Sequence, residues 1–223
     1  MILLSYPLFD YPIEIKENEV NVLVLESPKC FRKFIYEIKE TIKRDESKIH
    51  LSKDYEEVCF DKYVFPVFSV EGININSKKV LSKVYSDLKN LAYSETMYGE
   101  TMRILNQTVI YMDNLISNYE LSLFFDDFNI DVLLKSVDIK IESDEKEFLK
   151  MLCDYIDVVS NIFNIHIFIF FHLKEYLEEF ELLELYKHCN YRKINLILCE
   201  NTVKKNLPFE KLTIIDQDLC QIN

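Results

Sequence analysis

The sequence predicts an α/β protein with a mainly parallel sheet and a helical region inserted into it. Strand-like runs alternate with helices at both ends of the 223-residue chain, whereas about seventy residues in the middle show helical periodicity only. Only two glycines, Gly72 and Gly99, are present, which argues against a loop-rich β protein. We therefore expect a discontinuous α/β head over residues 1–75 and 160–223 and a helical leg over 76–159.

The N-terminal part holds the clearest strand and the helix that follows it. Residues 20–25 are apolar and β-branched almost throughout, as in a central parallel strand covered on both faces. Ser27 is a good N-cap, and Pro28 suits the first position of a helix. The helix then shows apolar residues at helical spacing: Phe31, Phe34, Ile35, Ile38 and Ile42.

The remaining elements follow from the same patterns. Further strands are expected over 49–51, 63–70, 165–171, 194–199 and 212–215. Pro66 favours a sheet edge or a bulge for the second of these. Helices are expected over 80–91, 102–116, 129–136 and 174–187. Asp144 and Glu147 have the spacing of a capping box, which predicts another helix that continues to about Asn164.

Cysteine usage and hydropathy indicate a soluble protein of the cytoplasm. The six cysteines have no close CxxC spacing, and a disulfide framework is not expected at this chain length. The first residues lack the basic region of a signal peptide. The longest apolar run, 165–173, contains histidines and is far shorter than the roughly 20 residues of a membrane span. We expect no membrane partner.

The turn after the first central strand holds Glu26, Ser27 and Pro28, where an α/β nucleotide-binding protein would have its phosphate loop. A P-loop needs glycines, a Lys and a Ser or Thr at fixed spacing, and none of that spacing is present. The partner strand in such folds ends in an acidic residue that helps to hold magnesium. The best candidate, 165–172, ends in Phe171 and His172. Hydrolysis of ATP or GTP is therefore not expected, and no catalytic residue is assigned.

Basic residues are concentrated in one helix of an otherwise acidic chain. The net charge of −12 by itself counts against nucleic acid as a partner. The helix over 28–44, however, has a local charge of +4. Its basic residues are Lys29, Arg32, Lys33, Lys39, Lys43 and Arg44, and its acidic residues are Glu37 and Glu40. The basic residues lie mainly off the apolar face, so they form either a stripe along a phosphate backbone or an ordinary solvated helix face.

Acidic residues are concentrated further along the chain. Ten carboxylates and three lysines lie between Asp113 and Glu147. Calcium takes several oxygen ligands, often from carboxylates in irregular loops, and an inter-helix connection is a suitable place. The candidates around that connection are Glu120, Asp126, Asp127 and Asp131. There is no EF-hand pattern, so helix caps and a solvated acidic face remain the alternative.

Several stretches of the chain, in their order and spacing, resemble one known family. They are Ser5-Tyr-Pro-Leu-Phe-Asp-Tyr-Pro-Ile-Glu-Ile15, Asn21-Val-Leu-Val-Leu-Glu26 with Phe31, Val70-Glu-Gly-Ile-Asn-Ile-Asn-Ser77, Glu120-Leu-x-Leu123 and Leu133-Leu-Lys-Ser-Val-Asp-Ile-Lys-Ile-Glu142. The chain is similar over essentially its whole length to the short form of the Csn-two family. These are the type II-A CRISPR-associated proteins of spacer acquisition.

The resemblance implies a head related to P-loop ATPases but without their motifs, and a helical leg inserted into it. It also implies a homotetrameric ring without enzymatic activity that binds the ends of double-stranded DNA through a lysine-lined central hole. Calcium would support the ring and DNA binding. The implied partners are the CRISPR integrase complex and the type II-A effector nuclease, with which the ring would act when new spacers are captured.

The resemblance carries over to individual DNA-binding residues. Lys29 and Lys33 match basic positions on the helix after the first central strand, and Lys135 and Lys140 match basic positions in the leg. Arg32 belongs to the same basic stripe as the first two. A ring can be acidic outside while its lysines face inward, so an acidic chain is compatible with this function.

The resemblance also concerns the acidic segment. Asp126 and Asp127 match carboxylates of the family's calcium region. Ser122 and Phe124 stand where relatives carry acids, which changes the expected number of calcium ions. The acids left to compensate are Glu120 and Asp131.

Two other functions fit the sequence. The first is a divalent-metal nuclease or a divergent nucleotide hydrolase that uses the carboxylates of the acidic segment. The second is a protein-interaction scaffold of the adaptation complex whose DNA binding is incidental.

Overall fold

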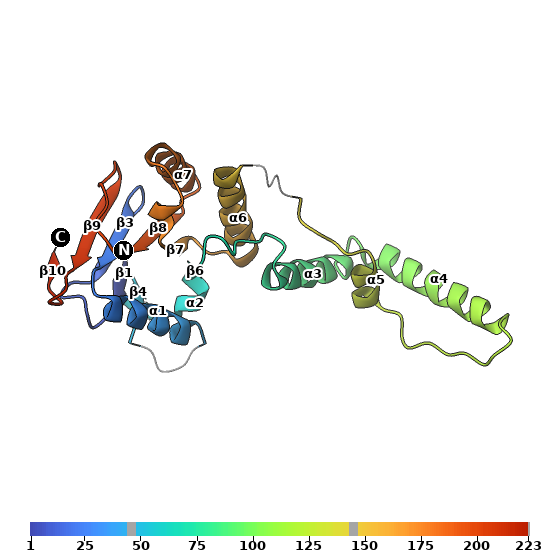
Figure 1. Ribbon diagram of the computed structural model, residues 1–223. Helices are drawn as coiled ribbons and strands as arrows, with labels where there is room; N and C mark the ends of the chain where they lie inside the picture. Colours follow the sequence, from blue (N-terminus) through green and yellow to red (C-terminus); the bar gives the residue numbers. More distant parts are fainter. Residues whose placement is uncertain (44–47, 143–146, 223) are drawn as a thin grey trace. The chain divides into compact units, whose positions relative to one another are not determined.

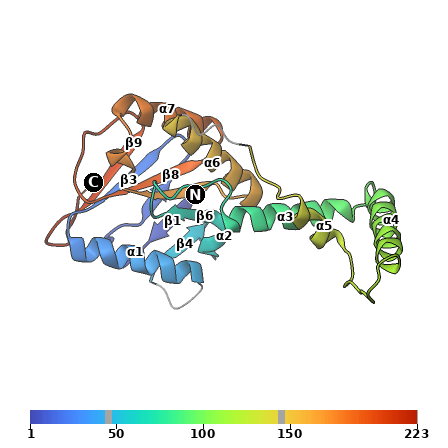
Figure 2. The same cartoon turned by 45° about the vertical axis from the view of Figure 1, so that its right-hand side comes forward.

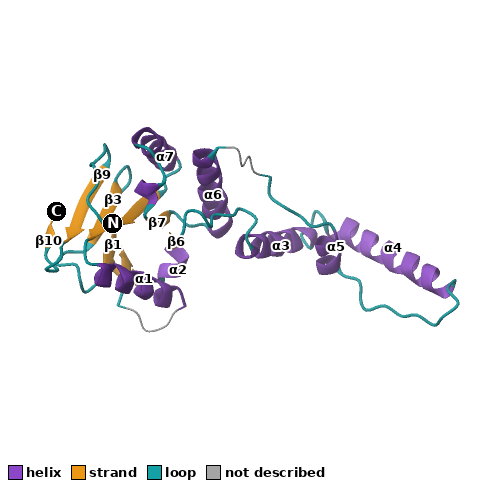
Figure 3. Ribbon diagram, in the orientation of Figure 1, coloured by secondary structure: helices purple, strands orange, loops and turns teal. Residues whose placement is uncertain are grey.

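A computed structural model describes residues 1–43, 48–142 and 147–222, and the chain divides into two compact units. The head unit comprises Met1–Asn74 and Ser143–Asn223, and the leg unit comprises Ile75–Glu142. Figure 3 shows that strands and helices build the head, whereas the leg contains helices and loops.

The head is built on a six-stranded sheet with the order β10-β9-β3-β8-β7-β6. All neighbouring strands in it are parallel except β10, which pairs antiparallel with β9. The strands are β3 (Val20–Leu25), β6 (Val64–Val67), β7 (Ile167–Phe171), β8 (Asn195–Glu200), β9 (Glu210–Ile215) and β10 (Gln221–Ile222). Every residue of β3 is buried. The expected mixed α/β fold with a mainly parallel sheet is confirmed, and Pro66 lies on the edge strand β6.

Helices cover both faces of this sheet, as Figures 1 and 2 show. The helix α1 (Pro28–Lys43) packs Phe31, Phe34 and Ile38 on one face. The helices α6 (Phe148–Phe163) and α7 (Glu179–Tyr191) lie on the other. The period-2 alternation of a buried strand sends consecutive side chains to opposite faces, so both layers of helices share the same strands.

The sequence analysis did not anticipate a second, antiparallel sheet with the order β2-β1-β4-β5. Its strands are β1 (Ile2–Ser5), β2 (Ile13–Ile15), β4 (His50–Lys53) and β5 (Glu56–Val58). Leu4, Ile13 and Leu51 share one apolar cluster with Phe34 of α1. The short helix α2 (Phe60–Tyr63) then leads into β6.

The leg unit contains α3 (Lys78–Ala92), α4 (Tyr98–Ser117) and α5 (Ile130–Ser136). Asn76 closes it: its Oδ1 accepts a hydrogen bond from the Ile141 amide at 2.8 Å, and its Nδ2 donates to the Ile141 carbonyl at 3.1 Å. The amide of Ile139 donates to the Tyr85 hydroxyl at 3.1 Å. The segment 139–141 is thus held by the side chain of Tyr85 in α3 and by that of Asn76, just before α3.

The leg is shorter than the sequence predicted. The expected boundary between residues 159 and 160 is wrong, because the leg unit ends at Glu142 and α6 belongs to the head. In the head, the rings of Tyr155 in α6 and Phe65 in β6 lie 6.3 Å apart, and Asp157 of α6 pairs with His188 of α7 at 3.0 Å. Asp144 of the expected capping box lies outside the described residues, and α6 begins after Glu147. The helix expected over 174–187 also begins later, after a 3₁₀ turn at Leu173–Glu175 and a capping box of Glu178 and Glu181.

Across the described ranges 1–43, 48–142 and 147–222, no helix is long and apolar enough to cross a membrane.

Candidate nucleic-acid interface

The junction between β3 and α1 passes directly from strand to helix. The Glu26 amide donates to the Ile215 carbonyl at 3.0 Å, and the Phe31 amide donates to the Ser27 carbonyl at 2.9 Å as the helix begins at Pro28. Proline has no N–H, and no glycine is present to let consecutive amides converge on a phosphate. The junction therefore lacks the backbone donors of a phosphate loop.

The first turns of α1 present a basic face. Lys29, Arg32 and Lys33 are exposed and lie three or four residues apart, so they share one side of the helix with Tyr36, which is 60% exposed. Burial of the opposite side against the sheet fixes this orientation. Within the described ranges, none of the three cations has an ion-pair or hydrogen-bond partner on its side chain.

The other charges of α1 are already engaged. Glu37 is buried and accepts a hydrogen bond from the Lys48 amide at 3.2 Å. Lys43 pairs with Glu40 at 2.9 Å. The Lys39 ammonium lies 4.9 Å from the centre of the Phe68 ring, and Arg44 lies outside the described residues. The uncompensated positive charge of the helix is therefore concentrated in its first two turns.

The two predicted basic residues of the leg differ from each other. Lys135 lies exposed in the last turn of α5 and has no charged partner among the described residues. Lys140 pairs with Asp138 at 2.8 Å, and this carboxylate raises the pKa of Lys140. Both lysines are therefore cationic, but the Lys140 ammonium is engaged by Asp138, whereas Lys135 is open to a ligand in the described part of the chain.

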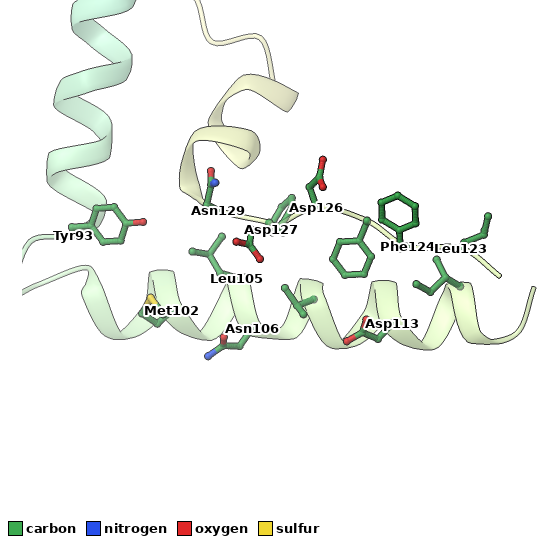
Figure 4. A pocket seen from close by; sticks show the side chains of 14 residues that line it. Tyr93, Met102, Leu105, Asn106, Asp113, Leu123, Phe124, Asp126, Asp127 and Asn129 are labelled. Atoms are coloured by element: carbon green, nitrogen blue, oxygen red, sulfur yellow. The ribbon is translucent and has the colours of Figure 1, made fainter.

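The acidic residues lie around a pocket of about 690 Å³ between α4 and the extended segment 123–129 (Figure 4). Asp113, Asp126 and Asp127 line it, together with aromatic and aliphatic side chains. Figure 4 shows Asp127 turned toward α4 and Asp126 turned away from it.

The metal site predicted at Glu120, Asp126, Asp127 and Asp131 stays a prediction. Asp131 is paired with Lys89 of α3 at 2.5 Å, and Glu120 is not among the residues that line the pocket. Among the residues that the structure describes, no group of three or more His, Cys, Asp or Glu side chains could hold an ion. The extended backbone of this segment spreads successive carboxylates along its length. Asp144 and Glu145 lie outside the described residues.

The sequence analysis missed one acidic residue at the edge of the main sheet. Strand β8 lies between β3 and β7 in the sheet, so β8 is the neighbour of β3. It ends in Glu200, which is 1% exposed. Its Oε1 accepts a hydrogen bond from the Lys174 amide at 3.1 Å, whereas Oε2 has no protein partner in the described part of the chain. Burial raises the pKa of Glu200. The signal was present, because an acid ends the apolar run 194–199, but only the strand order gives it meaning.

A buried ion pair lies next to Glu200. The ammonium of Lys174 lies 2.9 Å from Glu210 Oε2 and 3.0 Å from the Lys205 carbonyl, and the side chains of the pair are 4% and 0% exposed. The Tyr186 hydroxyl donates to Glu210 Oε1 at 2.6 Å, and the Leu207 amide donates to Oε2 at 2.8 Å. These bonds tie the connection 201–209 to the 3₁₀ turn after β7.

A sequence model of the Csn2 CRISPR-associated proteins matches residues 41–219, which is more than half of the chain. The chain belongs to the Csn2 family. The family predicted above as Csn-two is thereby confirmed. This Csn2-family chain is similar to the CRISPR-associated protein Csn2 of Streptococcus agalactiae, with 21% identity over 98% of this chain and 96% of the relative.

Solved structures that are similar to this Csn2-family chain include ATP-binding cassettes. One is a cassette of an ABC transporter in its ADP conformation, with 9% identity, a TM-score of 0.45, and coverage of 96% of this chain and 86% of the other. Another is a nucleotide-free cassette of an ABC transporter, with 12% identity, a TM-score of 0.41, and coverage of 90% and 81%.

Replacing Glu200→Gln should stabilise this Csn2-family chain at neutral pH. Burial raises the pKa of Glu200 in the folded protein above its ordinary value of 4.5. The free energy of unfolding therefore falls as the pH rises from 4.5 through this raised pKa, because the fold must then bury a charged carboxylate. Below 4.5 the group is protonated in both states, and the difference should disappear. Urea unfolding between pH 4 and 8 measures this, with the exposed Glu184→Gln as the control. If Glu200→Gln raises the free energy of unfolding by the same amount at every pH, the cause is not the charge of the carboxylate.

Proposed function

We propose that this chain is a non-enzymatic protein of CRISPR adaptation that binds the ends of double-stranded DNA as a homotetrameric ring. The observation that carries the proposal is the uncompensated basic face of α1, formed by Lys29, Arg32 and Lys33, in a chain of net charge −12 that belongs to the Csn2 family. The proposed partners are the CRISPR integrase complex and the type II-A effector nuclease. All six cysteines are free, which supports action in a reducing cytoplasm.

The basic face has the chemistry of a contact to the DNA backbone. Lys and Arg side chains on adjacent helical turns provide charge-assisted donors for phosphate oxygens, and such contacts carry no sequence information. Exposed Tyr36 adds an amphipathic side chain to the same face. A ring must accept any sequence, so backbone contacts suit the proposed function. Lys135 of the leg is a further candidate for phosphate contact.

The surface of the leg supports the proposed assembly. Only four apolar side chains of the leg are buried, namely Ile75, Val80, Leu105 and Ile130. Many others are exposed, with Phe124 at 91%, and Ile110, Tyr111 and Leu121 also open to solvent. Monomeric proteins rarely expose large apolar patches. Packing of copies through their legs would remove this surface from water and stabilise the helices.

Calcium enters the proposal through assembly. Calcium takes six to eight oxygen ligands, and the described carboxylates of one chain do not form such a site. Asp113, Asp126 and Asp127 nevertheless give the leg a strong negative charge next to its apolar surface. Bringing copies together concentrates these charges, and a divalent cation would reduce their repulsion.

The proposal predicts that linear duplex DNA competes for the protein far better than a relaxed circle of equal length. Binding should weaken steeply with salt, because each phosphate contact releases counterions. Light scattering should give the tetramer mass in calcium and a smaller mass with a chelator. Magnesium at the same concentration is the control for general screening.

Two outcomes would contradict this proposal. If the circle competes as well as the linear duplex, DNA does not enter from an end. If linear DNA becomes shorter during incubation with magnesium or manganese, the nuclease alternative is favoured.

A further inference from the structure

The head contains a second concave site, far from the β3–α1 junction in the topology of the sheet. It is a pocket of about 510 Å³ lined by the apolar residues Ile2 and Ile167 and by the polar residues Lys53, Lys62, Tyr63, Asn164, His166 and Asn195. All of these residues belong to the head unit. None of them was selected in the sequence analysis, because their positions in the sequence are unrelated.

The strand order brings these residues together. Tyr63 directly precedes β6, His166 directly precedes β7, and Asn195 begins β8. These three strands are parallel neighbours, so their amino ends meet at one edge of the sheet. The Asn195 amide donates to the His166 carbonyl at 2.7 Å, which fixes two of the residues beside each other. The β3–α1 junction lies at the carboxyl edge instead.

The second sheet and α2 add the cations. Lys53 ends β4, opposite Ile2 in the antiparallel register, and its ammonium lies 5.5 Å from the centre of the Tyr63 ring. Lys62 lies in α2 next to Tyr63. A cation over an aromatic face is attracted to it. Tyr63 therefore holds the Lys53 ammonium near the pocket.

The residues that line this pocket include cations and no acid. Within the described residues, Lys53 and Lys62 form no ion pair. Asp54, the acid that follows Lys53, is paired with the N-terminal amine at 2.7 Å. Glu56 lies opposite Lys53 in the hairpin but does not line the pocket. In a chain of net charge −12, a pocket with two lysines, a histidine and no acid is a distinct feature.

We propose that this pocket binds a phosphate group of a small or nucleic-acid ligand. Two ammonium groups match the charge of a phosphate dianion. The lining residues Asn164, Asn195 and His166 have side chains that can supply further N–H donors. The volume lies in the range of ligand pockets, which is about 300–1,000 Å³, so it accommodates a group attached to the phosphate. This site is separate from the basic face of α1 and does not depend on the proposed function.

A fluorescent variant tests the proposal locally. The chain contains no Trp, so Tyr63→Trp places a single indole in the pocket and keeps an aromatic face for Lys53. Pyrophosphate, ADP and two duplexes of equal sequence, one with 5′-phosphates and one with 5′-hydroxyls, are titrated at constant ionic strength. We expect a saturable change in emission with at least one of these probes. The probes that respond identify the source of the phosphate.

The control variants separate the pocket from general charge effects. Adding Lys62→Glu should weaken the response about tenfold or more, whereas adding Lys187→Glu on the exposed surface of α7 should leave it unchanged. If the indole disturbs the fold, titration calorimetry measures the affinity for the same probes in the protein that retains Tyr63, with and without Lys62→Glu. The proposal is overturned if no probe gives a saturable response, if sodium chloride gives the same change, or if Lys62→Glu leaves affinity unaltered.

Discussion

Reversing the charge of Lys29, Arg32 and Lys33 to Glu together should weaken binding of linear duplex DNA by at least about 100-fold at 0.1 M salt. Each phosphate contact contributes roughly 0.9 to the slope of log K against log salt, so the variant should also show a flatter salt dependence. The three side chains are exposed and have no partner in the described ranges, so folding should be unaffected. Fluorescence anisotropy over a salt series measures both effects.

The control for this prediction reverses Lys187 and Lys193, which are exposed in the head outside α1. Equal loss of affinity in the control would show that net charge, and not the α1 face, governs binding. The tetramer mass from light scattering should be the same for both proteins. If the α1 variant loses DNA but still supports spacer acquisition in cells, the scaffold alternative is favoured over the DNA clamp.

Replacing Lys174→Met should destabilise the protein by about 3–5 kcal/mol. The change leaves Glu210 charged, buried and without its cation, and it also removes the donor to the Lys205 carbonyl. The cost comes mainly from the unpaired carboxylate, because taking an isolated charge out of water is expensive. Urea unfolding at one fixed protein concentration measures the loss.

A second substitution distinguishes this cause from a packing defect. Adding Glu210→Gln removes the buried charge, while the glutamine carbonyl can still accept from the Tyr186 hydroxyl or the Leu207 amide. We expect the double variant to recover part of the lost stability. A double variant that is no more stable than Lys174→Met would mean that the unpaired carboxylate is not the cause of the loss.

The sequence predicted those features that depend on neighbours along the chain. The buried strand β3, the start of α1 at Pro28 and the basic face that follows were accessible because helical periodicity and capping are local properties. Pro66 indicated an edge strand for the same reason, since the missing N–H is a property of the residue itself. Membership in the Csn2 family likewise followed from the order of motifs in the sequence.

The sequence assigned the carboxylates of the leg to one site because they are close in sequence. In the structure Asp126 and Asp127 line one pocket, whereas Asp131 is paired with Lys89 and Glu120 does not line that pocket. The expected end of the leg was wrong, because the helical pattern of α6 is visible in the sequence but its packing partner in the head is not.

The sequence by itself thus determined the type of the main elements, the family and the exposed basic face of α1. Only the tertiary structure decided the strand order that puts Glu200 beside β3, the burial of Lys174 against Glu210, and the pocket of Lys53 and Lys62. The physical reason is that each of these depends on pairing between strands distant in the sequence. Such pairing is set by the burial of whole faces, and no local pattern encodes it.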